Sequence, residues 1–146
     1  MIDVVVQGEE TIIEFPAVDL ASSVPVTYVG PNLLRLDGVP LVEDSGASFG
    51  DVVRVSPISK NRFRFEKVVE PGGWSTYFYM FSRERFESPE GQLLFGFLDA
   101  IEVHWERVFG GILLICIPPE LASFKPHRWV CVTLRRKRER RRARSG

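Results

Sequence analysis

The sequence predicts an α+β fold: a small, strongly bent antiparallel sheet or SH3-like barrel, followed by a helix packed on a second small antiparallel sheet. Apolar and polar residues alternate over the first two thirds of the chain, with Gly and Pro between the alternating segments. After Ser82 the apolar spacing becomes helical. A chain of 146 residues has the length of one domain, which we place at residues 1–134, with a basic tail at 135–146.

The first part of the chain is expected to consist of short strands. The alternating segments are residues 11–15, 24–29, 33–36, 51–56 and 63–70, with a hairpin partner at 74–81. Pro71-Gly72-Gly73 is interpreted as the hairpin turn, because it lacks the spacing of a phosphate loop and precedes a strand. In Gly50-Asp51 we expect a turn whose Gly has a positive φ and whose Asp accepts a neighbouring backbone N–H.

The second part begins with the clearest helix signal in the chain. Ser88 is a typical N-cap and Pro89 suits the first helical position, so we expect a helix over residues 89–99. Strands follow at 102–109 and 112–117, and the second is apolar on both faces, as interior strands are. A short turn or helix at 120–124 then leads to a last expected strand at 127–134.

No catalytic signature is found in the sequence. His104 and His127 fall on expected strands, and nothing in the spacing brings either to a Ser, a Cys or a paired acid. Cys116 and Cys131 stand in apolar stretches without ligand spacing, which favours reduced core thiols, although a disulfide stays open if those stretches are neighbouring strands. We therefore expect a protein that is not an enzyme and has no cofactor or metal site.

Three sequence blocks carry a resemblance to a known family. They are LRLDGVP at 34–40, FGDVV at 49–53 and RFEKVVEPGGWST at 64–76. In order and spacing they resemble the RLDNIPF, GDVV and RVVExSGHST blocks of the bacterial domain-of-unknown-function family 4265, over about residues 11–119. The resemblance implies a shared fold and no established activity. Trp74 replaces the family's His, so an acid or base role for that His could not apply here.

Charge is distributed unequally along the chain. Residues 1–134 contain 11 Lys and Arg against 18 Asp and Glu, whereas residues 135–146 contain 8 against 1. An acidic body attracts basic proteins, and an arginine run attracts nucleic acid. The N-terminus lacks the pattern of a secretory signal and no apolar run is long enough to span a bilayer, so we expect a cytoplasmic protein without a membrane partner.

The first binding hypothesis is a protein partner, for example a basic toxin. Small bacterial domains of the resembled type tend to act as immunity or accessory proteins beside secreted toxins. The acidic residues expected to steer the partner, and the aromatic residues expected to anchor it, are Asp37, Glu43, Asp44, Asp51, Trp74 and Tyr77. A metal bound by these acids is less favoured than a solvated acidic patch. Tyr77, Tyr79 and Phe81 share one face of the expected strand, which favours a place in the core over an exposed stacking row.

The second hypothesis is nucleic-acid binding by the tail. Its cationic residues are Arg135, Arg136, Lys137, Arg138, Arg140, Arg141, Arg142 and Arg144. Such a run is attracted to phosphate without reading a sequence, and the acidic body opposes close approach. A solvated tail, or a tail folded back on the acidic body, is the alternative. The identity of the partner and the oligomeric state do not follow from the sequence.

Overall fold

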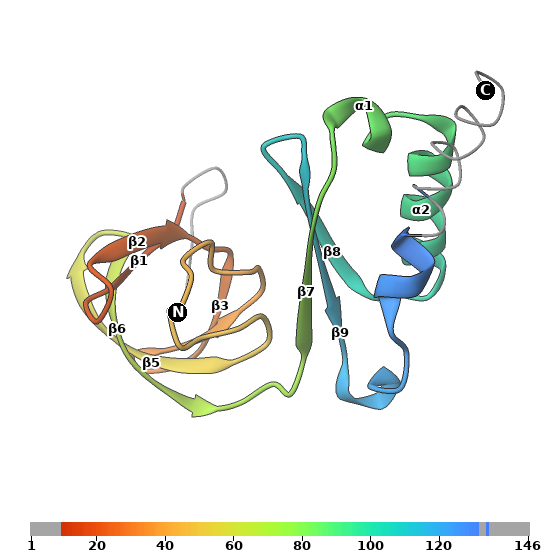
Figure 1. The fold of residues 1–146 in the computed structure, drawn as a ribbon. Coiled ribbons are helices and arrows are strands. Elements are labelled where there is room, and N and C mark those ends of the chain that lie inside the picture. Colours follow the sequence, from red (N-terminus) through yellow and green to blue (C-terminus); the bar gives the residue numbers. More distant parts are fainter. Residues whose placement is uncertain (1–9, 132–133, 135–146) are drawn as a thin grey trace, which may run out of the picture. The chain divides into compact units, whose positions relative to one another are not determined.

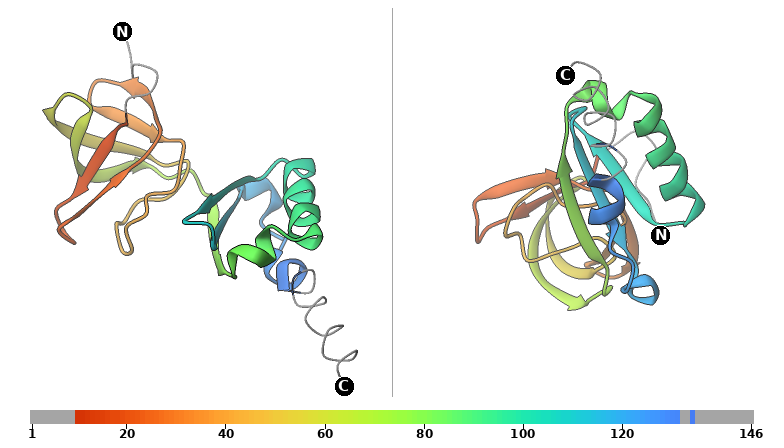
Figure 2. Two further views of the ribbon diagram at one scale, coloured as in Figure 1. Left: turned by 90° about the horizontal axis from the view of Figure 1, so that it is seen from above. Right: turned by 45° about the vertical axis from the view of Figure 1, so that its right-hand side comes forward.

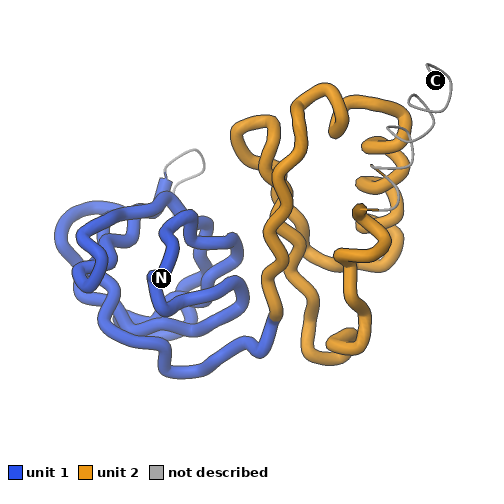
Figure 3. The backbone as a smooth tube through the Cα atoms, viewed as in Figure 1, with its two compact units in different colours: residues 1–74 blue, residues 75–146 orange. Residues whose placement is uncertain are grey.

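The computed structural model describes residues 10–131 and residue 134. The chain divides into two compact units, unit 1 (Met1–Trp74) and unit 2 (Ser75–Gly146), which Figure 3 distinguishes by colour. The α+β prediction is confirmed: a six-stranded sheet lies in unit 1, and a three-stranded sheet with helices lies in unit 2. The single domain expected over residues 1–134 therefore consists of two units, each with its own hydrophobic core.

Unit 1 is built on one mixed sheet. Its strands are β1 (Ile12–Phe15), β2 (Leu20–Ser23), β3 (Val26–Gly30), β4 (Leu33–Leu36), β5 (Val52–Ser59) and β6 (Arg62–Glu70). They lie in the order β2-β1-β6-β5-β4-β3 (Figure 1). The pairing of β1 with β6 is parallel and the other pairs are antiparallel. The prediction of a purely antiparallel sheet is therefore wrong for this unit.

The sheet of unit 1 must curl strongly, because its two edge strands are consecutive in the chain. In a flat sheet the edges of six strands would lie about 24 Å apart. Only Val24 and Pro25 connect β2 to β3, and the three chain steps from Ser23 to Val26 span at most about 11 Å. No ladder joins β2 to β3 within residues 10–74, so the sheet is bent, as predicted, without closing into the barrel named as the alternative.

The inner face of the curled sheet forms the core of unit 1. Ile13, Leu34 and Val53 have no exposed surface, and Phe15 and Val55 are 1% exposed. These residues alternate with outward side chains because successive residues of a strand point to opposite faces. Burial in these strands thus repeats every two residues, as does the apolar alternation that predicted them.

Unit 2 contains a sheet of three antiparallel strands with helices beside it. Its elements are β7 (Ser75–Met80), α1 (Arg83–Phe86), α2 (Pro89–Ala100), β8 (His104–Val108), β9 (Ile112–Ile117), the short 3₁₀ helix η1 (Pro119–Leu121) and a helical segment at 126–131 and 134. The strand order β7-β9-β8 confirms the prediction that residues 112–117 form an interior strand. No helix among the described residues has the length and apolarity needed to cross a bilayer.

Helix α2 begins where the sequence predicted. The Ser88 hydroxyl accepts the Gly91 N–H at 3.2 Å, and Pro89 occupies the first turn. Leu94 and Leu98, one turn apart, are fully buried. They belong to the core of unit 2, together with Leu113 and Ile115 of β9. The helix therefore covers one face of the three-stranded sheet (Figures 1 and 2).

Two predicted strand assignments are wrong. Residues 74–81 do not form a hairpin with residues 63–70, because β6 already has β1 on one side and β5 on the other, and β7 pairs with β9 instead. Residues 127–134 are helical where described. Pro126 starts this helix, a position that proline favours, and Val130 and Leu134 are both buried one turn apart.

Two glycines of α2 provide a matched test of how closely this helix approaches the end of α1. A Cβ on Gly91 would lie 2.0 Å from the carbonyl oxygen of Phe86, whereas a Cβ on Gly96 would meet nothing within 4 Å. We expect Gly91→Ala to lower the free energy of unfolding by roughly 2 kcal/mol or more. Gly96→Ala should raise it by about 0.5–1 kcal/mol, since Ala favours helix. Urea denaturation of both variants checks this, and equal effects of the same sign would contradict the close approach of Gly91 to Phe86.

Candidate functional site

The three sequence blocks converge on the carboxylate of Asp51, which is 7% exposed. Its Oδ2 accepts the Ser48 N–H and its Oδ1 accepts the Gly72 N–H, both at 2.9 Å. Its carbonyl accepts the Leu36 N–H at 2.9 Å. One residue thus fastens the end of β4, the turn before β5 and the segment after β6, since hydrogen bonds to a buried carboxylate are strong.

The backbones at this junction approach too closely for side chains. Gly50 has φ +87°, and a Cβ there would lie 2.7 Å from Cδ1 of Trp74. A Cβ on Gly72 would lie 2.5 Å from the carbonyl oxygen of Gly50. Trp74 also packs edge-on against Phe49, with ring centroids 4.7 Å apart. The structure confirms the turn expected at Gly50-Asp51, and Trp74 fills a packing position.

An open groove of about 890 Å³ lies beside this junction. Its wall includes Gly50, Gly72 and Glu70, together with Arg35, which forms an ion pair with Asp37 at 3.0 Å. No Ser, Thr, Cys or His is among the described residues that line it. Its described lining therefore offers no hydroxyl, thiol or imidazole, and Glu70 is its one carboxylate.

The residues expected to dock a protein partner do not form one surface. Glu43 and Asp44 are exposed, whereas the Asp51 side chain is buried in its turn. Asp37 is held by Arg35 and by the Thr27 hydroxyl. Glu43 and Asp44 are thus the members of this acidic set best placed to meet a partner.

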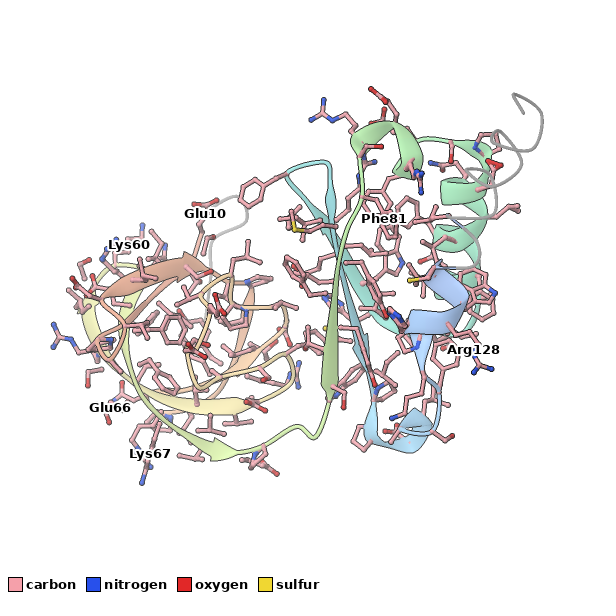
Figure 4. The ribbon with its side chains drawn as sticks, in the orientation of Figure 1. Glu10, Lys60, Glu66, Lys67, Phe81 and Arg128 are labelled. Atoms are coloured by element: carbon pink, nitrogen blue, oxygen red, sulfur yellow. The ribbon has the colours of Figure 1, made fainter. Side chains whose placement is uncertain are left out.

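The two aromatic anchors expected beside those acids lie in different units. Trp74 ends unit 1, and Tyr77 belongs to unit 2, where it packs against the core. Tyr79 is 8% exposed and Phe81 also packs on that core, which confirms the core interpretation of this aromatic row. Figure 4 labels Phe81 on the helix-bearing side of the unit. The cationic tail residues from Arg135 to Arg144 lie outside the described residues.

One face of the three-stranded sheet carries a thiol beside polar groups. Cys116 lies opposite both Thr76 and His104 in the strand register, and Nε2 of His104 is 2.6 Å from Oε2 of Glu106. The Cys116 thiol is fully buried, and burial raises its pKa to about 11. A thiol that is protonated and closed to solvent is a poor nucleophile, so this cluster is structural.

A second thiol lies beside a histidine on the C-terminal helix. Sγ of Cys131 is 3.7 Å from Nδ1 and 3.8 Å from Nε2 of His127. Residues four apart are neighbours on a helix, whereas in a strand they would be about 13 Å apart. The prediction that nothing brings a His to a Cys is therefore wrong. Pro126 before this spacing is the signal that could have revealed the pair.

The hydroxyl of Tyr79 lies buried in the same region. Its oxygen has no hydrogen-bond partner among the residues that the structure describes. The ring stacks on that of His127, with centroids 6.0 Å apart and planes inclined by 18°. Burial raises the pKa of Tyr79 to about 12, and its neighbours Cys131 and Tyr77 contribute to the rise. Such unpaired buried groups are rare in native proteins.

Comparison with known proteins supports the fold. No family model and no curated protein matches the sequence. A solved structure, titled "Novel crystal structure of a hypothetical protein from Neisseria gonorrhoeae", is similar with a TM-score of 0.58 and 9% sequence identity, covering 91% of each chain.

Within residues 10–131 and 134, no group of three or more His, Cys, Asp or Glu could hold a metal ion.

The Asp51 junction is testable by an isosteric change. We expect Asp51→Asn to lower the free energy of unfolding by about 2–3 kcal/mol, because an amide N–H₂ would face a backbone N–H that now donates to a carboxylate. The exposed Asp44→Asn serves as the control and should stay within about 0.5 kcal/mol of the parent. Chemical denaturation followed by tryptophan fluorescence measures both. Equal stability of the two variants would show that the bonds to Ser48 and Gly72 contribute little.

Removing the Tyr79 hydroxyl should stabilise the protein. Tyr79→Phe keeps the ring and deletes a buried polar group without a described partner, so we expect the free energy of unfolding to rise by about 1 kcal/mol. Tyr28→Phe, at a ring that is 39% exposed, should change it little. Thermal and urea unfolding of both variants provide the comparison. A loss of stability in Tyr79→Phe would mean that the hydroxyl is hydrogen-bonded in solution.

Proposed function

We propose that this chain is a non-enzymatic protein-binding module, and that an exposed apolar patch in unit 2 supplies its anchors. The patch, called the hairpin-end patch, comprises Phe78, Met80, Val108, Phe109 and Ile112. The observation that carries the proposal is the exposure of its large side chains: Phe78 is 58% exposed, Met80 69% and Phe109 83%. Phe and Met are enriched at protein interfaces, and contiguous exposed apolar groups mark interaction sites.

The strand register makes the patch continuous. Met80 lies opposite Ile112, and Ile112 lies opposite Val108, so their side chains stand in one row on the same face of the sheet. Phe78 is two residues before Met80 and therefore shares that face. Phe109 follows Val108 in the turn between β8 and β9 (Figure 1). The row ends at the hairpin tip, on the face of the sheet opposite the helix-covered core.

Phe109 has an unfavourable conformation as well as an unfavourable environment. Its φ is +53°, a left-handed value that strains a bulky residue. Gly110 beside it has φ +77°, and its carbonyl oxygen accepts two hydrogen bonds from the Arg107 guanidinium, at 3.0 and 2.8 Å. The turn thus fixes the backbone that presents the exposed Phe109 ring. A backbone that is already ordered loses little conformational entropy when the residue binds.

Charge favours a basic partner. Residues 1–134 contain 11 Lys and Arg against 18 Asp and Glu, and an acidic region attracts basic surfaces over about a Debye length without contact. Glu43 and Asp44 are exposed and add to this field. A basic toxin bound in the cytoplasm, as by an immunity protein, fits this charge and the family resemblance. We rank it first among protein partners.

Nucleic acid remains the second candidate, because residues 135–146 contain 8 Lys and Arg against 1 acid. Phosphate contacts by such a run make binding steeply dependent on salt. A chain ending at Leu134 retains the described residues and lacks the run. Loss of nuclease-sensitive material with this truncation would support the tail as the binding part.

The decisive experiment is affinity capture from native lysate, divided into nuclease-treated and untreated halves, followed by titration of the captured protein against variants. We expect Met80→Ser with Phe109→Ser to weaken binding at least about tenfold, as loss of buried anchors does. Leu93→Ser, on α2 at 70% exposure, is the matched control and should bind normally.

Binding that is lost on nuclease treatment, or that is unaffected by the double substitution, contradicts the proposal. Phe109→Asn is a useful companion because Asn tolerates a positive φ. It should reduce binding while preserving or raising stability, which separates loss of the anchor from loss of the fold.

A further inference from the structure

The His127–Cys131 pair has the arrangement of a reactive thiol, which the proposed binding function does not use. His127 is exposed and Cys131 is partly exposed, so small molecules in solvent reach both. The imidazole nitrogens lie 3.7 and 3.8 Å from the sulfur. An imidazole at this distance takes a proton from a thiol after a small rotation, and the thiolate is the nucleophilic form of cysteine.

Tyr79 adds a second, independent feature. Its hydroxyl is buried and has no hydrogen-bond partner among residues 10–131 and 134, while its ring stacks on His127. His127 contacts both residues, since its ring stacks on the Tyr79 ring and its nitrogens lie 3.7 and 3.8 Å from the Cys131 sulfur. An oxygen atom added to the sulfur would give this unpaired hydroxyl a hydrogen-bond acceptor.

The second cysteine cannot complete a disulfide with Cys131. Both cysteines are free. Cys116 alternates along β9 with Ile115 and Ile117, which belong to the helix-covered core, so its side chain is on the opposite face of the sheet. The C-terminal helix packs on the core side through Val130 and Leu134. Figure 4 shows Arg128 on the outer side of this helix, away from the sheet. Within the described chain, no second cysteine can therefore form a disulfide with an oxidised Cys131.

We propose that Cys131 is a site of oxidation by hydroperoxides, with His127 as the base and the Tyr79 hydroxyl as the donor to the product oxygen. The proton of the thiol passes to His127. The thiolate sulfur then attacks one peroxide oxygen, an S–O bond forms and the O–O bond breaks. The sulfur loses two electrons and the peroxide gains them. The leaving oxygen takes the proton from the imidazolium, and Cys131 ends as a sulfenic acid.

The test uses the full-length chain, hydrogen peroxide and dimedone, with adducts on each cysteine measured by peptide mass spectrometry. Cys116 is the internal control in the same molecule. We expect the Cys131 adduct to form at least about tenfold faster than the Cys116 adduct, because the buried thiol is protonated and inaccessible. Comparable labelling of the two thiols in the folded protein overturns the proposal without any variant.

Variants then separate the roles of the neighbouring side chains. His127→Gln should slow labelling of Cys131 at least about fivefold, as loss of a positioned base does. His104→Gln, the other histidine, is the matched control and should leave the rate unchanged. If His127→Gln keeps the parent rate while circular dichroism reports an intact fold, the base is not His127 and the proposal fails.

Tyr79→Phe tests how long the sulfenic acid survives, and not how fast the thiolate attacks the peroxide. When dimedone is added after the peroxide has been removed, the yield reports how long the sulfenic acid survives. We expect this delayed yield to fall at least about threefold in Tyr79→Phe, because a hydrogen bond to the product oxygen is lost. The initial rate should stay near the parent value. An unchanged delayed yield overturns the role assigned to the Tyr79 hydroxyl.

Discussion

The fold of unit 1 depends on one buried carboxylate. Asp51 accepts the N–H groups of Ser48 and Gly72, and no apolar side chain could satisfy these two donors together. The donors come from segments far apart in sequence. Because Gly72 lies against the carbonyl of Gly50, the chain leaves the sheet along one path. The junction is therefore specified by a few atoms, and two of its glycines, Gly50 and Gly72, also line the groove beside it.

Unit 2 follows a different principle, in which one interior strand organises both faces of its sheet. The residues of β9 alternate between a helix-covered core and a face that holds Cys116. The same alternation separates the two thiols, and it directs Phe78 and Met80 away from the helices. Packing, thiol chemistry and surface character in this unit are all consequences of strand register.

Much of the fold could be predicted because local signals agreed with the tertiary structure. Ser88 and Pro89 marked the helix start, alternation marked β4, and a short run that is apolar on both faces marked β9. The segment after Pro126 was misassigned because a short apolar run fits a strand as well as a helix, and only the proline and the burial of Val130 and Leu134 distinguish a helix. The prediction of a hairpin after β6 was wrong for another reason: which strands pair depends on the whole sheet. In the candidate site, the turn at Asp51 could be predicted because it is local. The His127–Cys131 pair could not, because its helix had been assigned as a strand.

The parallel pairing of β1 with β6 has a consequence for the order of assembly. Ile12 opposes Arg62, and this ladder closes the longest stretch of chain in the sheet. The pairs of β3 with β4, β4 with β5 and β5 with β6 close much shorter loops and lose less chain entropy when they form. Local contacts of this kind form early in folding. The N-terminal hairpin is then the last part to join, onto a meander that is already curled, and strand-by-strand amide exchange would resolve that sequence of events.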